Sequence, residues 1–302
     1  MFESAELGHK IKKEDFATEE PVLREKLLDV QYELLEKPEF SVIILVGGVD
    51  GAGKGETANL LLEWMDPRHI HAHAIDAPTK DEKAQPRLYR FWQRLPPRGK
   101  IGVFLGSWYT DPIIDRGYKR SSPADFDKAM AEIVSFERML SNERVLVIKF
   151  WLHLAKRTQK KRLQALEADS RTAWRVTPLD WERYAMYDRF RKLSERALRT
   201  TSTSVAPWYV IESTDDEYRA LSVGHILHDA IRKRIDDPVH NTQTHAPPLP
   251  QPIDKLDILG ALDLNLSLEK EQYTKELDAL QAKLNKLSRD PRFKRRSVVM
   301  VF

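Results

Sequence analysis

The feature that most constrains this chain is a glycine-rich loop between an apolar run and a helical pattern. Residues 41–46 (SVIILV) are apolar on both faces of a strand, which predicts a buried strand. The loop that follows contains Gly48-x4-Gly53-Lys54, and apolar residues then recur at helical spacing over 57–65. A strand, a glycine loop and a helix in this order predict a P-loop, whose backbone N–H groups bind phosphate.

This loop departs from the usual P-loop pattern at the residue after the lysine. A Ser or Thr hydroxyl ordinarily contacts Mg²⁺ there, whereas this chain has Gly55. Asp50 lies within the loop, and a carboxylate beside a polyanion is unfavourable unless a cation lies between them. We therefore expect Asp50 to hold Mg²⁺; the alternative is that it caps a local turn. The residues expected to bind phosphate here are Gly48, Gly51, Gly53, Lys54 and Gly55.

Further apolar runs alternate with helical patterns along the chain. The other expected strands are 70–75, 100–105, 145–151 and 208–212. The expected helices are 20–36, 57–65, about 81–95, 123–142, 154–168, 178–203, 215–235 and 269–288. Alternation of this kind predicts a parallel sheet with helices on both faces. We therefore expect residues 1–235 to form one α/β domain.

The character of the sequence changes after residue 235. Residues 236–268 are rich in proline and are expected to form an exposed linker. Residues 269–302 then resemble the beginning of the chain, because a set of apolar residues spaced 7, 4 and 3 apart precedes Ser-Val and an apolar run in both places. The two sets are Phe16, Leu23, Leu27 and Val30, and Tyr273, Leu280, Leu284 and Leu287.

This similarity predicts an internal repeat. Residues 269–302 would be the start of a second, truncated repeat, and its last residues, 297–302 (SVVMVF), would form a strand. The alternative is two unrelated amphipathic helices, each followed by a strand. On the first interpretation, the chain is a fragment of a longer protein.

Composition and charge limit the partners of the chain. It has 302 residues and no cysteine, which excludes disulfides and thiolate chemistry and fits a cytoplasmic protein. Its apolar runs are too short to cross a bilayer, so no membrane partner is expected. Residues 156–199 carry 13 Lys and Arg against 6 Asp and Glu, although the net charge of the whole chain is only +3.

This local excess of positive charge indicates an anionic partner. The alternative is an ordinary solvated helix face. No base-stacking platform or recognition motif accompanies the basic residues, so a nucleic acid is not expected.

Several separate motifs resemble those of one known family. GGVDGAGKGE (47–56), DPR (66–68), LPPRGKIGVFLGSWY (95–109) and WRVTPLDW (174–181) resemble the family-2 polyphosphate kinases, and in particular the N-terminal half of the two-repeat polyphosphate:AMP phosphotransferase type. The resemblance extends over the whole chain. It implies a three-layer, thymidylate-kinase-like P-loop kinase fold with a five-stranded parallel sheet and a basic helical lid at about 153–206.

The resemblance also implies an activity and the residues that carry it. The activity is Mg²⁺-dependent transfer of a phosphoryl group between inorganic polyphosphate and a nucleoside mono- or diphosphate, with AMP converted to ADP. The implied catalytic residues are Asp50, Lys54, Arg90 and Arg116. The lid residues implied to bind polyphosphate are Lys160, Lys161, Arg171 and Arg175.

One segment departs from the family pattern. Members usually end the third strand with Asp-Arg-Ser-x-Tyr, whereas this chain has Leu-Gly-Ser-Trp-Tyr at 105–109. The missing acid and arginine would anchor a metal and stabilise the transferring charge, and Asp111 and Asp115 lie beyond the strand. An alternative function is therefore a catalytically degenerate repeat with a structural or regulatory role for an active second domain. The expected protein partners are the second repeat and another copy in a homo-oligomer.

Three further interpretations are weaker. An ATP-dependent nucleoside monophosphate kinase is disfavoured by Gly55 and by the basic lid. His69, His71 and His73 share one face of a strand and could bind a metal, although hydrogen-bonded structural histidines are the alternative. Three aromatic residues could stack on a base or simply pack against the protein: Trp174, Trp181 and Tyr187.

Overall fold

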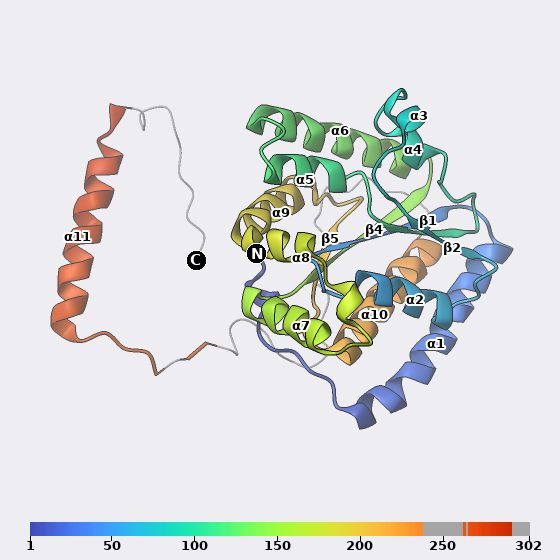
Figure 1. Ribbon diagram of the computed structural model, residues 1–302, viewed down its shortest axis with the longest axis horizontal. Coiled ribbons are helices and arrows are strands. Elements are labelled where there is room, and N and C mark those ends of the chain that lie inside the picture. The colour runs from blue at the N-terminus through green and yellow to red at the C-terminus, as the bar shows by residue number, and fades with distance from the viewer. Residues whose placement is uncertain (238–261, 264, 292–302) are drawn as a thin grey trace. The chain divides into compact units, whose positions relative to one another are not determined.

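A single parallel sheet forms the centre of the first part of the chain (Figure 1). The computed structural model describes residues 1–237, 262–263 and 265–291. The strands are β1 (Ser41–Gly48), β2 (Ile70–Ala74), β3 (Ile101–Leu105), β4 (Val145–His153) and β5 (Trp208–Glu212). Their order is β2-β3-β1-β4-β5 and all pairs are parallel. Because β1 is the middle strand, the glycine loop leaves the sheet at the centre of its carboxyl edge.

Helices cover both faces of the sheet (Figure 1). One face carries α1 (Lys13–Glu36), α2 (Lys54–Trp64) and α10 (Asp216–Asp236). The other carries α5 (Thr110–Gly117), α6 (Pro123–Asn142) and α9 (Tyr187–Thr201). The remaining elements are η1 (Glu3–Ala5), α3 (Lys80–Lys83), α4 (Tyr89–Trp92), α7 (Lys156–Ala168), η2 (Ala173–Arg175) and α8 (Pro178–Ala185). These three layers confirm the predicted α/β P-loop kinase fold.

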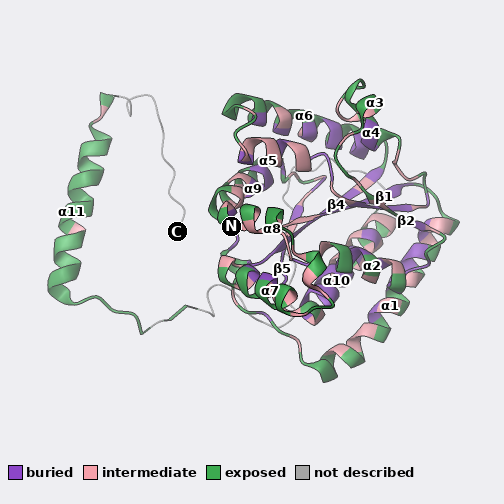
Figure 2. Ribbon diagram, viewed as in Figure 1, coloured by how far each residue is buried: buried purple, intermediate pink, exposed green. Residues whose placement is uncertain are grey.

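The position of β1 in the middle of the sheet explains why its sequence is apolar without interruption. Val42, Ile44 and Val46 belong to the core beneath α1, α2 and α10, whereas Ile43 and Leu45 belong to the core beneath α5, α6 and α9. All five side chains are buried, as the purple strands of Figure 2 show. A strand that is buried on both faces needs apolar residues at every position.

All five predicted strands are confirmed, but some helix predictions are wrong in detail. Residues 81–95 do not form one helix: α3 and α4 are short and separate, since Pro86 lies between them and proline interrupts a helix. The predicted helix 178–203 is divided into α8 and α9 at Met186. Helix α1 begins at Lys13 rather than near residue 20, and α5 was not predicted.

The chain divides into two compact units, Met1–Gly260 and Ala261–Phe302. In the second unit, α11 (Lys270–Ser288) confirms the predicted helix 269–288. Most of the expected linker, 236–268, and the whole of the expected strand, 297–302, lie outside the described residues. The second repeat and the domain boundaries therefore stay predictions.

Within residues 1–237, 262–263 and 265–291, none of the helices combines the length and the apolar character needed to cross a bilayer.

Candidate active site

The glycine loop turns tightly between β1 and α2. Gly48 has φ +149°, and a Cβ added to it would lie 2.3 Å from the carbonyl oxygen of Leu152. Gly53 has φ +83° as the N-cap of α2, and its Cβ would lie 2.4 Å from a guanidinium nitrogen of Arg219. Both positions therefore require glycine. The loop places its backbone at the N-terminus of α2, where the helix dipole and free N–H groups favour an anion.

Lys54 folds back across this loop. Its ammonium donates to the carbonyl oxygens of Gly48 and Val49, each at 3.1 Å, and to the Asp50 carboxylate at 3.3 Å. The positive charge therefore lies at the mouth of the loop, where it would meet a bound phosphate.

Asp50 lies between two cations. One carboxylate oxygen is bonded to Lys54, and the other lies 3.4 Å from Nη1 of Arg183. Burial alone would raise the pKa of Asp50, but the charges of Lys54 and Arg183 outweigh it and lower the pKa below its usual value. Asp50 is therefore ionised at neutral pH.

The residues of this site fit Mg²⁺ through one carboxylate. Asp50 supplies an ionised oxygen ligand, whereas Gly55 and Leu105 supply none. No cluster of three or more His, Asp or Glu side chains suited to a metal occurs in the part of the chain that the structure describes. Mg²⁺ commonly takes one or two carboxylates and completes its shell with substrate phosphates and water, and Asp50 is suited to that kind of site.

The segment between β4 and α9 reaches over the loop and bonds to it. Gln159 Nε2 donates to the carbonyl oxygen of Asp50 at 2.9 Å, and Arg162 donates to that of Gly51 at 2.9 Å. Arg175 pairs with Glu56 at 2.6 Å. The predicted lid is thus in contact with the P-loop at several points.

The other lid residues that the sequence singled out lie apart from the loop. Lys160 and Lys161 are exposed on α7, and neither makes a hydrogen bond or ion pair with any described residue. Arg171 is also exposed and pairs with Asp169 at 2.8 Å. Of the four predicted lid cations, Arg175 alone contacts the P-loop region, through Glu56 at the start of α2.

The two predicted arginines outside the lid lie away from Asp50 as well. Arg90 is buried on α4, where it donates to the carbonyl oxygen of Asp76 at 2.6 Å and lies 3.4 Å from Glu82. Arg116 lies on α5 and donates to the carbonyl oxygen of Ser121 at 2.9 Å. The structure therefore brings Asp50 and Lys54 together, but not Arg90 and Arg116 with them.

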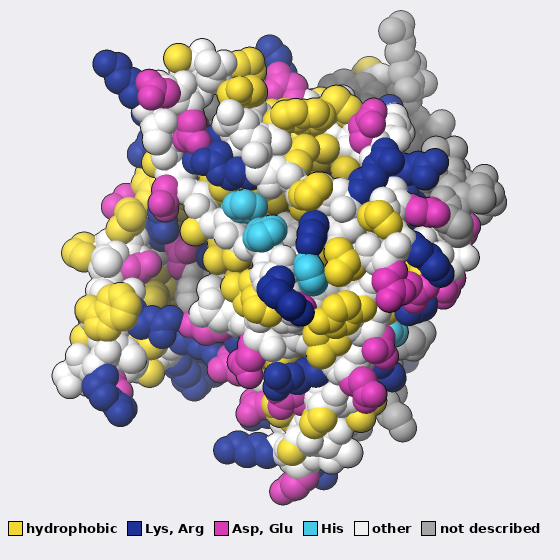
Figure 3. Space-filling model, turned by 90° about the vertical axis from the view of Figure 1, so that its right-hand side faces the viewer, with side chains coloured by type: hydrophobic (Ala, Val, Ile, Leu, Met, Phe, Trp, Pro, Cys, Tyr) yellow, Lys and Arg dark blue, Asp and Glu magenta, His cyan; other side chains and the backbone are white. Residues whose placement is uncertain are grey.

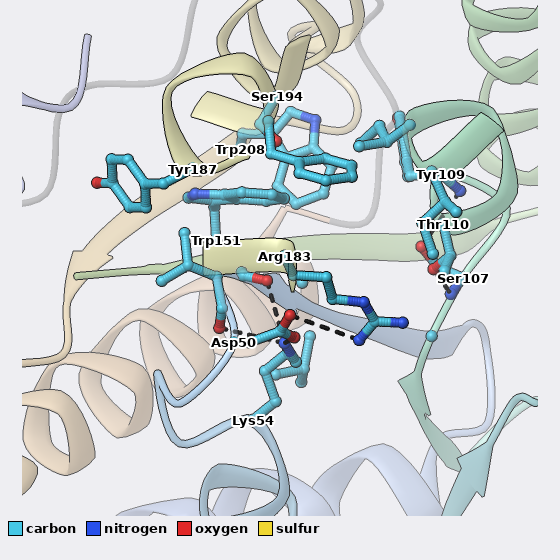
Figure 4. A pocket seen from close by; sticks show the side chains of 18 of the residues that line it. Asp50, Lys54, Ser107, Tyr109, Thr110, Trp151, Arg183, Tyr187, Ser194 and Trp208 are labelled. Carbon is cyan, nitrogen blue, oxygen red and sulfur yellow. Dashed lines mark hydrogen bonds and ion pairs between the residues drawn. The ribbon is translucent and has the colours of Figure 1, made fainter. Parts of the chain in front are cut away.

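A cavity of about 290 Å³ opens beside the loop. Figure 4 shows Trp151 and Trp208 lying over Asp50, Lys54 and Arg183. Most of the lining is apolar or aromatic, and its residues are Val46, Gly47, Gly48, Val49, Asp50, Lys54, Gly106, Ser107, Tyr109, Thr110, Ile113, Ile114, Trp151, Gln159, Arg183, Tyr187, Phe190, Ser194 and Trp208. The cavity is therefore lined by charged side chains beside the P-loop and by aromatic side chains elsewhere.

The segment that departs from the family pattern forms one wall of this cavity. Leu105 ends β3 beside Val46 of β1. Gly106 has φ +80°, and a Cβ there would lie 2.7 Å from the carbonyl oxygen of Ile75. Asp111 does not line the cavity; it is half-buried on α5, where burial raises its pKa. No carboxylate among the described lining residues replaces the missing acid.

Sequence reasoning missed Arg183, Gln159 and most of the aromatic walls, although it named Tyr187, which lines the cavity. Arg183 lies only two residues beyond the WRVTPLDW motif, and Gln159 lies between the basic residues of α7. The basic composition of the lid was a signal for this region, but it could not say which side chains face the loop.

The weaker candidates lie in different surroundings, and of these residues Tyr187 lines the cavity. His69 Nδ1 lies 2.5 Å from the Lys100 ammonium, and His71 is exposed on the edge strand β2. Figure 3 views the molecule from this side and shows histidines beside lysines and arginines. Trp174 is 78% exposed, whereas Tyr187 is buried and donates its hydroxyl to the carbonyl oxygen of Leu154 at 2.8 Å. Trp181 packs edge-on against Tyr184.

Comparisons with known proteins agree with this fold. The family described as polyphosphate kinase 2 (PPK2) matches residues 10–238. A polyphosphate:AMP phosphotransferase of Pseudomonas aeruginosa is 45% identical over 303 residues, which cover 100% of this chain and 61% of that protein. An AMP/ADP-polyphosphate phosphotransferase of Meiothermus ruber is 32% identical over 206 residues, 68% of this chain and 77% of that protein.

A solved structure is similar as well. The crystal structure of polyphosphate kinase 2 from Arthrobacter aurescens superposes with a TM-score of 0.72 at 26% identity, covering 84% of this chain and 86% of that one. The chain thus spans less than two thirds of the Pseudomonas protein, but the family match covers most of its own length. The P-loop, the sheet order and these similarities lead to one conclusion: the chain belongs to the polyphosphate kinase 2 family.

Proposed function

We propose that this chain is a polyphosphate-dependent nucleotide phosphotransferase that moves a phosphoryl group between inorganic polyphosphate and AMP. The observation that carries the proposal is the position of Asp50, bonded to Lys54 and Arg183 at the mouth of a P-loop and beside a cavity. The two relatives described above are named for polyphosphate and AMP or ADP, which favours AMP as the acceptor.

The roles of the residues follow from their positions. The N–H groups between Gly48 and Gly55 would bind the phosphates, and Lys54 would neutralise their charge. Arg183 would exchange its contact with Asp50 for contacts with phosphate oxygens. In the reaction, the terminal P–O–P bond of polyphosphate breaks as an oxygen of the AMP phosphate bonds to the transferred phosphorus, and the shortened polyphosphate keeps the bridging oxygen.

Asp50 would then be free to hold Mg²⁺, whose charge would neutralise the phosphates during transfer. Phosphoryl transfer depends on positioning and charge neutralisation more than on covalent catalysis, and the residues of this site are of the types needed for that. The exposed cations of the lid, Lys160, Lys161 and Arg171, could contact the remainder of a polyphosphate chain.

The test is ADP formation from AMP, polyphosphate and Mg²⁺ by the purified chain. We expect Asp50→Asn to lower the rate by roughly 100-fold or more, as the loss of one electrostatic contact in a phosphoryl or acyl transfer site does. The matched control is Asp127→Asn, because Asp127 is also paired with an arginine but lies exposed on α6. A rate of ADP formation in Asp50→Asn equal to that of the wild type would exclude this site as the catalytic site.

A second candidate function is favoured by one specific observation. Leu105 and Gly106 stand where the family usually has an acid and an arginine, and the described cavity wall offers no substitute for that acid. The chain would then bind the substrates without catalysis and would have a structural or regulatory role for an active second domain of a longer protein. Binding of AMP and polyphosphate without ADP formation would favour this candidate over the first.

A further inference from the structure

Four consecutive carbonyl oxygens of the glycine loop each accept a hydrogen bond from a side chain. They belong to residues 48–51, and the donors are Lys54, Gln159 and Arg162. Because a trans peptide directs its C=O and its N–H to opposite sides, a side chain that holds the carbonyl oxygen also decides where the N–H of the next residue points.

Most N–H groups of the same loop are free. Those of five residues donate to no group in the described ranges: Asp50, Gly51, Gly53, Lys54 and Gly55. Free backbone N–H groups at the N-terminus of a helix favour a bound anion. The loop thus keeps its donors available for a phosphate, while its acceptors are bonded to the protein.

The peptide between Asp50 and Gly51 is the one that could most easily turn over. Gly51 has φ +78°, and glycine adopts positive and negative φ about equally well. The only hydrogen bond from a described residue to the carbonyl oxygen of Asp50 comes from Gln159 Nε2, at 2.9 Å. If this peptide rotated by half a turn, its carbonyl oxygen would face the phosphate and repel it.

Gln159 reaches this peptide from α7, the first helix of the lid. The side chain is 3% exposed, its Oε1 is enclosed by protein atoms, and its Nε2 is bonded to the loop. Arg162 lies three residues later, on the same face of the helix, and donates to the next carbonyl oxygen, that of Gly51, at 2.9 Å. Since Gln159 carries no charge, its effect on a bound phosphate passes through the loop peptide.

We propose that Gln159 is a positioning residue for the P-loop. By holding the carbonyl oxygen of Asp50, it keeps the N–H of Gly51 directed toward the phosphate, and Arg162 holds the following peptide in the same way. This inference rests on the proposed function for the identity of the ligand as a phosphate chain. It adds that the lid helix α7 sets the orientation of the loop.

The sequence allows the Gly51 amide to be observed alone. The dipeptide Asp-Gly occurs once in the chain, at 50–51. Labelling aspartate at its carbonyl carbon with carbon-13 and glycine with nitrogen-15 therefore gives one signal, that of Gly51, in a carbonyl-correlated NMR spectrum. Titration of the wild type with inorganic tripolyphosphate should move this signal downfield until binding saturates, because donation to phosphate deshields the amide proton.

The variant Gln159→Met removes the donor and keeps a side chain of similar length. We expect its tripolyphosphate affinity, measured by calorimetry, to fall about tenfold, the effect of losing a hydrogen bond to a charged group. The downfield shift of the Gly51 signal should be lost as well. The matched control is Gln164→Met, because Gln164 is exposed on the same helix. A purely structural role of Gln159 would lower the Tm and leave the affinity and the Gly51 shift of the folded chain unchanged.

The outcomes separate this inference from the proposed function. A Gly51 signal that stays constant as the wild type binds tripolyphosphate would overturn the positioning role even if the chain forms ADP, and so would equal affinity in the wild type and Gln159→Met. Loss of affinity and of the shift in the variant would support the role even if no ADP forms, and in that case the catalytic proposal alone would fail. A wild type that does not bind tripolyphosphate would overturn both.

Discussion

Among the single residues of the site, Asp50 pairs with two cations, Lys54 and Arg183. Lys54 comes from the same loop, whereas Arg183 comes from α8, more than 130 residues away in the chain. Without a ligand, the two cations neutralise the carboxylate. A bound phosphate would compete for the same cations, so phosphate binding and the lid contact with Asp50 should be linked.

Replacement of Arg183 tests this link. We expect Arg183→Gln to weaken tripolyphosphate binding about tenfold, since a charge-assisted contact to phosphate is lost, and Arg183→Lys to restore part of the affinity. Isothermal titration calorimetry measures both. Arg199→Gln is the control, because Arg199 is exposed on α9 and pairs with Glu195. Unchanged affinity in Arg183→Gln would remove Arg183 from the site.

Some residues of the site could be predicted from the sequence and others could not. Asp50 and Lys54 were predictable because a P-loop is a local motif, complete within a few residues. The contacts of Arg183, Gln159 and Trp151 depend on how distant elements pack, and no spacing in the sequence encodes them.

Gly106 gives a second example. The sequence shows that an arginine is missing there, whereas the structure shows that the backbone now adopts φ +80° against the carbonyl oxygen of Ile75. A non-glycine residue in a left-handed conformation costs about 1–2 kcal/mol before any clash. Restoring the arginine alone would therefore require the loop to move.

At the scale of elements, the strands were predictable and several helix boundaries were not. A strand buried on both faces has a continuous apolar sequence, and β1, β3 and β4 follow that pattern. The edge strand β2 (IHAHA) was found although most of its positions are exposed. Helix α5 is short and follows β3 after a brief turn, so it lacks the long apolar periodicity that identifies α6. The separation of α7 from α8 was predicted, whereas η2 and the break between α8 and α9 at Met186 were not.

A buried polar network joins several of these elements. Lys149 of β4 is fully buried, and its ammonium donates to Glu137 of α6 at 2.7 Å, to the Tyr109 hydroxyl at 3.0 Å and to the carbonyl oxygen of Thr201 at 2.8 Å. Burial lowers the pKa of Lys149, and the charge of Glu137 opposes that shift. All three ammonium hydrogens are therefore engaged, and the network fixes the wall of the cavity that carries Tyr109.

We expect Lys149→Met to destabilise the chain by about 3–5 kcal/mol, because it leaves Glu137 charged and buried without its partner. Urea unfolding followed by circular dichroism measures the change. The double variant Lys149→Met with Glu137→Leu should recover much of the loss, since no buried charge then remains. A single variant as stable as the wild type would show that the pair does not hold these elements together.

At the scale of the whole molecule, the first residues close the layers near the end of β4. Phe2 is fully buried and stacks on His153 with 4.5 Å between the ring centroids. His153 Nε2 is bonded to Glu6 at 2.7 Å. Burial lowers the pKa of His153, although Glu6 opposes the shift. The neutral form of His153 is therefore favoured in the folded chain.

This arrangement predicts a pH dependence of stability. The unfolded chain binds a proton at His153 near pH 6.5, whereas the folded chain does so only at a lower pH. The contribution of His153 to the free energy of unfolding is therefore fully present above about pH 6.5. It is lost as the pH falls below that value, by at most about 1.4 kcal/mol per pH unit for one group. His73, whose pKa is also lowered by burial, contributes in the same direction.

Thermal unfolding at pH 7.5 and 5.5 measures the effect. The wild type should have a lower Tm at pH 5.5, and His153→Gln should reduce the difference between the two pH values. His71→Gln, at an exposed position on β2, should change the difference much less than His153→Gln, because it acts only through the charge near His73. An equal difference in the wild type and in His153→Gln would show that His153 does not couple stability to pH.

For the whole chain, we propose that the P-loop site transfers a phosphoryl group from polyphosphate to AMP. Phosphorus NMR of a mixture of the chain, AMP, polyphosphate and Mg²⁺ tests it most directly, because donor and product are observed together. We predict that the β-phosphorus signal of ADP will grow as polyphosphate shortens, and that Lys54→Ala will abolish both changes. A folded chain that binds AMP and leaves the polyphosphate signal constant would contradict the claim.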